Sequence, residues 1–286
     1  MASLLHKSLA WLRVPSNSLS YQLRARLRWS RGAPQLANES KDELFGWLAE
    51  AERRVVERRE RQLRDRYDLQ DLWLRSKQLH YLETLGWLDG FEPLLSGLQL
   101  PTGEDRLLRA VDVGCGLFQY ATALHRTLAR GGRGEPRRVV LRGIEVDGHG
   151  VYPDFHSRAD HARAHASLAS SDVSFEVADF LKKRLPQQDV VTMLFPFLTC
   201  YPLLDWGLPI GFHRPRRMLQ HAVATLREGG MLVVVNQTET EYARLCELLA
   251  GLPVERVRSR QMTTRLVPYT ERTADRRASV WLRSPD

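Results

Sequence analysis

The ten residues LLRAVDVGCG (residues 107–116) decide the fold class of this chain. They form a short apolar run that ends in two glycines, as expected for a buried strand of a parallel sheet followed by a turn. Glycine has no Cβ, so the backbone of such a turn can approach a ligand closely. Open parallel sheets bind their ligands at this place, beyond the carboxyl ends of the strands. Taken alone, the glycine pair fits a structural turn as well as a binding loop.

Beyond residue 116, strand-like apolar runs alternate with helix-like runs up to the C-terminus. This alternation predicts a parallel sheet covered by helices on both faces. The expected strands span residues 107–113, 139–146, 173–177, 190–195, 231–235, 254–258 and 278–282, and the expected helices span residues 120–130, 160–167, 216–226 and 241–249.

Acidic residues stand at the ends of the first three strands. Glu145 ends the second strand, where a carboxylate can accept hydrogen bonds from both hydroxyls of a ribose. The separation between the first glycine turn and Glu145 is longer than usual, because the composition of residues 131–138 predicts an inserted loop. Asp179 follows the third strand, where it can bond the exocyclic amine of an adenine, with Phe180 against the ring. Acidic residues at the ends of three successive strands, Asp112, Glu145 and Asp179, are a much less common pattern than any one of them alone. Taken by itself, Glu145 also fits a surface carboxylate just past a strand.

These motifs resemble those of class I S-adenosylmethionine-dependent methyltransferases, from about residue 106 to the C-terminus. VDVGCG resembles the family's first motif, GIEVD the end of its second strand, VADF its adenine-contacting motif, DVVTMLFPF its fourth strand, and ATLREGGMLVVVNQ its helix, glycine turn and fifth strand. The resemblance implies an α/β, Rossmann-like, doubly wound sheet of seven mostly parallel strands, with an antiparallel final strand and an N-terminal helical extension.

The resemblance also implies S-adenosyl-L-methionine as the cofactor. The two glycines of the first motif would pass under its methionine moiety, and the aspartate before them would order the loop. One position departs from the family's pattern, because Phe118 stands where a third small residue is usual. A fold that has lost the cofactor is therefore an alternative to an active enzyme. The expected cofactor-binding residues are Asp112, Gly114, Cys115, Gly116, Glu145, Asp179 and Phe180.

The acceptor is expected at the loop after the fourth strand and at the N-terminal helices. That loop is rich in aromatic residues, which also suit plain packing. It lacks the Asn-Pro-Pro-Tyr pattern of many methyltransferases that act on amino groups of nucleic acids and proteins. A polar cluster after the second strand suits either the acceptor or the start of the next helix, with Asp160 as a candidate cap. The acceptor candidates are Phe195, Phe197, Tyr201, Trp206, His156 and Arg158.

The sequence singles out neither a catalytic residue nor a metal site. Methyl transfer from a sulfonium is an in-line displacement, in which positioning supplies much of the rate. A base is needed only when the acceptor must first lose a proton. The three cysteines are far apart, and no metal-ligand spacing accompanies the histidines. So few cysteines fit a reducing compartment, and the cytoplasm is the expected location.

Residues 1–38 form a basic arm without an acidic residue. Pro15 separates two short segments that each fit an amphipathic helix, as in a transit peptide or a helix that lies on a membrane through residues 1–34. The alternative is a helical arm that packs on the domain. Residues 39–103 are expected to form a helical cap, with helices at 39–66 and 72–88, and residues 104–286 the methyltransferase-like domain.

The sequence as a whole predicts a methyltransferase that acts on a small molecule. Its net charge of +8 is compatible with a nucleic-acid acceptor, but no RNA-binding module is evident. A catalytically silent binding module is the alternative from a different class of protein. A nicotinamide-dependent oxidoreductase would require a third glycine at the place of Gln119. The oligomeric state does not follow from the sequence.

Overall fold

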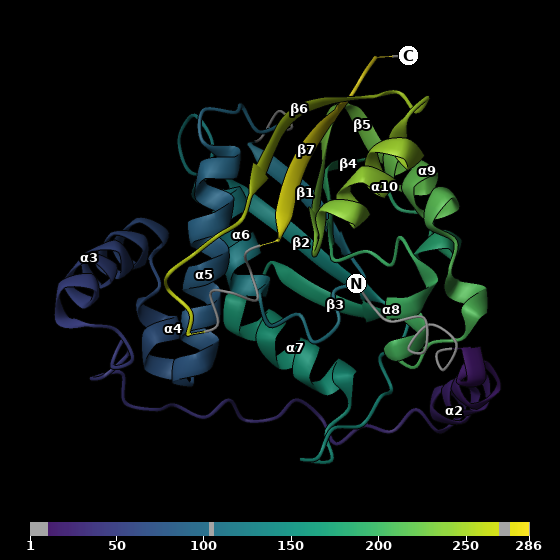
Figure 1. Cartoon of the computed structure of the whole chain (residues 1–286), viewed down its shortest axis with the longest axis horizontal. Coiled ribbons are helices and arrows are strands. Elements are labelled where there is room, and N and C mark those ends of the chain that lie inside the picture. The colour runs from purple at the N-terminus through teal and green to yellow at the C-terminus, as the bar shows by residue number, and fades with distance from the viewer. Residues whose placement is uncertain (1–10, 103–105, 269–274, 286) are drawn as a thin grey trace.

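The computed structural model describes residues 11–102, 106–268 and 275–285. Its centre is a seven-stranded sheet with the strand order β3-β2-β1-β4-β5-β7-β6 (Figure 1). Strands β1 to β5 are parallel, and β7 is antiparallel to both of its neighbours. The expected fold class is therefore confirmed. The strands are β1 (Leu107–Val113), β2 (Arg138–Glu145), β3 (Val173–Val177), β4 (Gln188–Leu194), β5 (Leu226–Asn236), β6 (Val254–Gln261) and β7 (Arg277–Arg283).

The strand order reverses between β1 and β4. The chain builds outward from β1 to β3, returns to pair β4 with β1, and then builds outward in the other direction. The connections after β1 and β4 therefore leave toward opposite faces and open a crevice at the carboxyl ends of the strands. The glycine turn after β1 lies at this crevice.

Helices cover both faces of the sheet (Figure 1). Leu124 of α6 shares a hydrophobic cluster with Ala110 of β1. Leu219 of α9 belongs to a second cluster with Val111. Neighbouring residues of a strand point to opposite faces, so β1 contributes to both cores. The helices of the domain are α6 (Ala121–Arg130), α7 (Arg158–Ala169), α8 (Cys200–Asp205), α9 (Pro215–Thr225) and α10 (Glu239–Leu249), with short 3-10 turns η1 (Phe180–Lys182) and η2 (Ile210–Phe212).

The N-terminal helices end elsewhere than the sequence predicts. They are α3 (Glu50–Tyr67), α4 (Gln70–Arg75) and α5 (Gln78–Leu95). Residues 42–47 form turns instead of the first part of α3, and Phe45 is buried there. Helix α5 continues through Pro93, because Leu94 and Leu95 are buried in the core and their burial outweighs the missing N–H of the proline. Strand β5 likewise begins early, at Leu226, around a bulge opposite Gln188.

Helix α2 (Val14–Leu27) lies at one end of the molecule (Figure 1) and packs through its polar face. Asn17 is buried, and its Nδ2 donates to the carbonyls of Leu204 and Leu208 at 2.9 and 3.2 Å. Pro15 lies in the first turn, where the missing N–H has no helical partner to lose. The rest of the first predicted segment, residues 1–10, lies outside the described residues. Within the described ranges, no helix has the length and apolar character needed to cross a bilayer.

Candidate functional site

A cleft of about 690 Å³ opens at the carboxyl ends of the strands. This volume is in the range of clefts that enclose a small molecule or cofactor. Its floor is the turn after β1, and its walls come from the segments after β2, β3 and β4. The strand order thus brings together residues that are far apart in the chain, at the place where the sequence predicts a ligand.

Gly114 and Gly116 have left-handed backbones, with φ of 75° and 56°. The N–H of Gly114 donates to the carbonyl of Ile144 at 2.8 Å, which ties the turn to the end of β2. A Cβ built on Gly114 would meet nothing within 4 Å, so the backbone conformation requires glycine here and the space above it is open. Cys115 between them is buried, and burial raises the pKa of its thiol. Its side chain is therefore an inert part of the core.

Asp112 lies beneath the turn and not in the wall of the cleft. Its carboxylate accepts hydrogen bonds from the hydroxyl of Tyr120, at 2.7 Å, and from that of Thr192. Burial raises the pKa of Asp112 to about 6, the charge of Glu145 adds to this, and the two hydrogen bonds oppose it. The geometry agrees with a role in ordering the loop, because Asp112 links β1 to β4 and to the start of α6.

Phe118 accommodates its bulky side chain by turning it into the core. The residue has a left-handed backbone, with φ of 54°, and is fully buried. Its ring fills the space over Gly143, where a Cβ would lie 2.8 Å from Cε1. The sequence analysis did not single out Gly143 as the residue that makes room for this ring, although Gly143 is the first residue of the GIEVD motif. Because Gly143 on β2 has no side chain, the large side chain of Phe118 after β1 fits into the core.

Glu145 lines the cleft and holds two loops at once. One carboxylate oxygen accepts from the N–H of Gly116 at 3.0 Å, and the other from the N–H of Asp147 at 2.9 Å. A carboxylate has about four acceptor positions, so both oxygens keep capacity for a ligand. These bonds hold the carboxylate at the edge of the glycine turn, which is the position required for a ribose contact.

Asp179 and Phe180 lie at the next strand end along the same cleft. The Asp179 carboxylate accepts from the N–H of Leu181 at 3.1 Å and so caps η1. Phe180 is mostly buried, in an edge-to-face contact with His221 at 4.7 Å between ring centroids. Asp179 thus presents a polar group to the cleft, while Phe180 offers only part of its ring.

The acceptor candidates separate into two groups. Phe195, Phe197 and Trp206 line the cleft. Tyr201 does not, because it points into a small cluster around Leu203 and Leu204. A contact between Tyr201 and the acceptor stays a prediction.

His156 and Arg158 also lie outside the cleft wall, and their side chains contact other parts of the protein. Nδ1 of His156 is 3.0 Å from the carbonyl of Gly32 in the N-terminal segment. The Arg158 guanidinium donates to Asp147 at 2.9 Å and lies 4.8 Å from the centroid of the Trp206 ring. Arg158 therefore supports the cleft indirectly, by holding Trp206.

The polar cluster at the start of α7 is a helix cap. Ser157 and Asp160 form a capping box, in which each side chain accepts from the backbone N–H of the other. Asp160 also accepts from Ser30 and from the N–H of Arg31. These bonds bring the pKa of Asp160 down to about 2 although burial acts to raise it. The sequence left open whether this cluster contacts the acceptor or caps α7, and the structure shows that it caps α7.

Sequence reasoning missed several residues in the wall of the cleft. Among them are Glu83 and Trp87 on α5, Gln237 after β5, and Arg276 before β7. Only the expectation that N-terminal helices reach the acceptor pointed toward the first two. No group of three or more His, Cys, Asp or Glu side chains in the described part of the chain is placed to hold a metal ion.

The sheet decides the fold assignment, because its order 3-2-1-4-5-7-6 and its antiparallel β7 are those of one fold. The chain has a class I methyltransferase fold. No family model and no curated protein matches the sequence.

Several solved structures are similar. Magnesium protoporphyrin IX methyltransferase from Synechocystis PCC 6803 with bound SAM is 16% identical, with a TM-score of 0.44, 72% of this chain covered and 81% of that one. The [4+2]-cyclase SpnF is 14% identical, with a TM-score of 0.44 and coverages of 71% and 82%. N-methyltransferase NodS from Bradyrhizobium japonicum is 14% identical, with a TM-score of 0.40 and coverages of 62% and 86%. Because all three TM-scores are below 0.5, the fold assignment rests on the strand order of this chain.

Proposed function

We propose that this chain binds S-adenosyl-L-methionine in the cleft and transfers its methyl group to a small-molecule acceptor. One observation carries the proposal. Two left-handed glycines and two carboxylates, Glu145 and Asp179, meet along one cleft at the ends of three successive strands. The open space above Gly114 fits the methionine end of the cofactor. The carboxylates fit the hydroxyls of its ribose and the amine of its adenine.

When bound, the sulfonium of the cofactor supplies an activated methyl group. The residues of this chain then need to orient the acceptor in line with that group and to exclude water. Phe195, Phe197 and Trp206 provide apolar surface for this purpose in the wall of the cleft. No dedicated base is assigned, because an acceptor that is already a nucleophile does not require one.

The charges of the cleft favour a small acceptor over a nucleic acid. Three carboxylates besides Glu145 and Asp179 line it, namely those of Glu83, Asp205 and Glu241. Arg214 and Arg276 are the arginines of the same wall. A wall with this balance repels a polyphosphate backbone, since nucleic-acid sites present clustered basic residues. A nucleic-acid acceptor is therefore the weaker candidate.

Cofactor titration tests the proposal. Calorimetric titration with S-adenosyl-L-methionine is expected to show one site, and Glu145→Gln is expected to weaken binding roughly tenfold or more, because charge-assisted bonds to the ribose are lost. The glutamine keeps an oxygen for the N–H of Gly116 but turns its NH2 group toward the N–H of Asp147, so the free energy of unfolding of the variant is measured alongside to show that both loops stay in place. Glu135→Gln is the matched control, because Glu135 is an exposed carboxylate of the 131–138 loop that pairs with Arg106. Absence of binding at millimolar cofactor would sink the proposal and favour a silent binding module.

A further inference from the structure

The guanidinium of Arg276 is a positive charge in the wall of the cleft. Arg276 precedes β7, and its backbone carbonyl accepts from the N–H of Met262 at 2.7 Å, which extends the pairing of β6 and β7. The segment around Met262 crosses α5 closely, because a Cβ on Gly90 would lie 2.2 Å from its methyl carbon. The small residue on α5 thus lets this segment reach the cleft.

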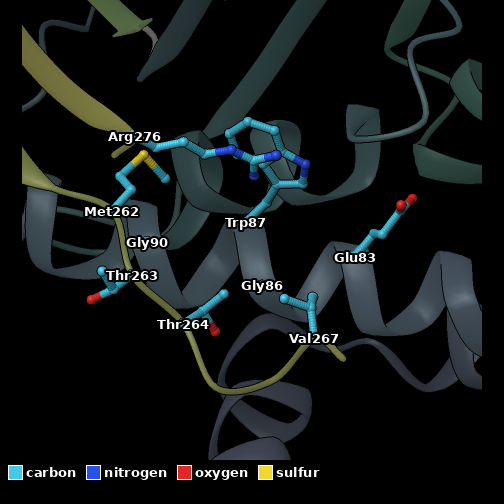
Figure 2. Close-up of a pocket in the computed structure, with 9 residues that line it drawn as sticks. All are labelled: Glu83, Gly86, Trp87, Gly90, Met262, Thr263, Thr264, Val267 and Arg276. Carbon is cyan, nitrogen blue, oxygen red and sulfur yellow. The ribbon is translucent and has the colours of Figure 1, made fainter. Parts of the chain in front are cut away.

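Two aromatic rings hold the guanidinium of Arg276. Its Cζ lies 5.5 Å from the centroid of the Trp87 ring and 5.0 Å from that of Phe195. The two rings are themselves 5.6 Å apart. Figure 2 shows the guanidinium beside the indole of Trp87, on the same helix as Glu83. An arginine that lies along aromatic faces is oriented by them and can still donate from the edge of its plane.

The backbone of Phe195 is strained in a way that serves this arrangement. Phe195 follows β4 directly and has φ of 60°, a conformation that a bulky residue rarely adopts. Its N–H donates to the carbonyl of Val235 at 2.8 Å, which keeps it in line with β5. Such strain persists where the surrounding structure requires it, and it concentrates at functional sites. Here it places the Phe195 ring in the wall of the cleft beside the guanidinium of Arg276.

We propose that Arg276 binds a carboxylate of the methyl acceptor and that the acceptor is a small carboxylic acid with an apolar body. This inference rests on the proposed function and names its substrate class. The planar guanidinium offers five N–H donors, so it can keep contacts within the protein and still bind both oxygens of a carboxylate. Trp87 and Phe195 offer apolar surface to the body of the acceptor. Glu83 and Glu241 in the same wall disfavour the double charge of a phosphate.

Matched acids and amides test the substrate class. The protein is saturated with S-adenosylhomocysteine and titrated calorimetrically with benzoate, cinnamate, indole-3-acetate and octanoate, and with the amide of each. At least one acid is expected to bind tenfold or more tightly than its amide, and Arg276→Gln is expected to remove that preference. Arg276→Lys keeps the charge without the planar fork and is expected to fall between the two. Arg54→Gln, at an exposed arginine of α3 that pairs with Glu50 outside the cleft wall, is the matched control and is expected to keep the preference, while Arg214→Gln removes the other arginine of the cleft wall.

The cofactor site separates the failure of this inference from that of the proposed function. Arg276→Gln is expected to bind S-adenosylhomocysteine within twofold of the unaltered protein, which also shows that the variant folds. If the unaltered protein binds S-adenosylhomocysteine but prefers no acid to its amide, the carboxylate assignment is wrong and the proposed function stands. A preference removed by Arg214→Gln and not by Arg276→Gln would also overturn it. Failure to bind S-adenosylhomocysteine at all would count against the proposed function.

A second inference comes from the outer face of α2. Leu19, Leu23 and Leu27 follow one another at four-residue spacing and are 61%, 52% and 78% exposed. Trp11 and Trp29, at either end, are also exposed. An ordinary surface helix buries its apolar stripe, whereas the inner face of α2 carries the polar Asn17 and Arg24 together with Tyr21, and the leucines lie on the outer face. Arg24 of that face donates to the buried carboxylate of Asp147 at 2.7 and 3.0 Å, so the orientation of the helix is set by a buried ion pair.

We propose that the outer face of α2 docks on an anionic lipid surface. Arg26 and Arg28 are exposed beside the leucines, and residues 1–34 contain no acidic residue. Two copies paired through this face would bring these arginines together, whereas anionic headgroups neutralise them. Exposed leucines between flanking tryptophans and arginines suit a helix that lies in the interface of a bilayer.

Vesicle co-sedimentation tests this surface. The bound fraction is expected to be at least fivefold higher on vesicles of phosphatidylcholine with phosphatidylglycerol than on phosphatidylcholine alone, and to be lost in the Leu19→Gln, Leu23→Gln, Leu27→Gln variant. The control replaces exposed apolar residues of other helices, as Val55→Gln, Leu74→Gln and Leu79→Gln, and is expected to bind normally. Equal binding to both vesicles, or no binding, would contradict the proposal. Self-association that the leucine variant abolishes would assign the face to a second copy instead.

Discussion

The part of the cleft that we propose binds the cofactor (the cofactor half) and the part that we propose binds the acceptor (the acceptor half) are built in different ways. The first consists of the glycine turn, Glu145 and Asp179, which end successive strands and are held by backbone N–H groups. The second consists of Trp87, Phe195 and Arg276, which come from distant segments and whose side chains meet in ring–ring and cation–π contacts. Short motifs can specify the first kind of site, because each strand end sets its own residue in place. The second kind exists only after the segments have packed.

The contact between Phe118 and Gly143 is expected to be the most sensitive point of the cofactor half. Gly143→Val would place a Cβ 2.8 Å from the Phe118 ring and 2.9 Å from Sγ of Cys115. Overpacking of this kind is expected to lower the free energy of unfolding by about 3 kcal/mol. Phe118→Leu is expected to relieve part of that loss, which urea unfolding of the two single variants and the double variant measures. Strictly additive energies would mean that the two residues are not coupled.

Asp112 is expected to give the stability a pH dependence. Its pKa is about 6 in the folded state, above the value of 3.8 for an unperturbed carboxyl. The folded state therefore holds this proton more tightly, so the stabilisation is fully present below pH 3.8 and is lost as the pH rises through about 6. The change is on the order of 3 kcal/mol.

Urea unfolding between pH 4 and pH 6.5 checks this sign. Asp112→Asn cannot ionise, so the difference in stability between the variant and the unaltered protein is expected to shift in favour of the variant as the pH rises. Parallel curves for the two proteins over this range would show that Asp112 does not titrate there.

The glycine turn is expected to show a smaller effect. Gly114→Ala meets no steric obstacle but must adopt φ of 75°, so it is expected to lower the free energy of unfolding by about 1 kcal/mol. Gly211→Ala is the matched control, because its Cβ also meets nothing within 4 Å and its φ is not left-handed. An equal loss in both variants, measured by thermal unfolding, would remove the backbone argument at Gly114.

The cofactor half and the order of the elements could be predicted from the sequence. The apolar run before Gly114, the acidic strand ends and the alternation of strands with helices each reflect local constraints that a short segment must satisfy by itself. The boundaries of α3 and α5 could not, since Phe45 and Leu94 are buried by contacts that the segments do not contain. The contacts of His156 with Gly32 and of Arg158 with Asp147 could not be predicted either, because they depend on how the segments pack.

The sequence by itself determined the sheet, its glycine turn and the carboxylates of its strand ends, because these depend on periodicity and on backbone conformation. Only the tertiary structure decided that Phe118 turns into the space over Gly143, that α2 faces outward with its leucines, and that Arg276 reaches the cleft between two aromatic rings. Each of these depends on which side chain meets which across the fold. Such meetings are set by the packing of whole elements, which no single segment encodes.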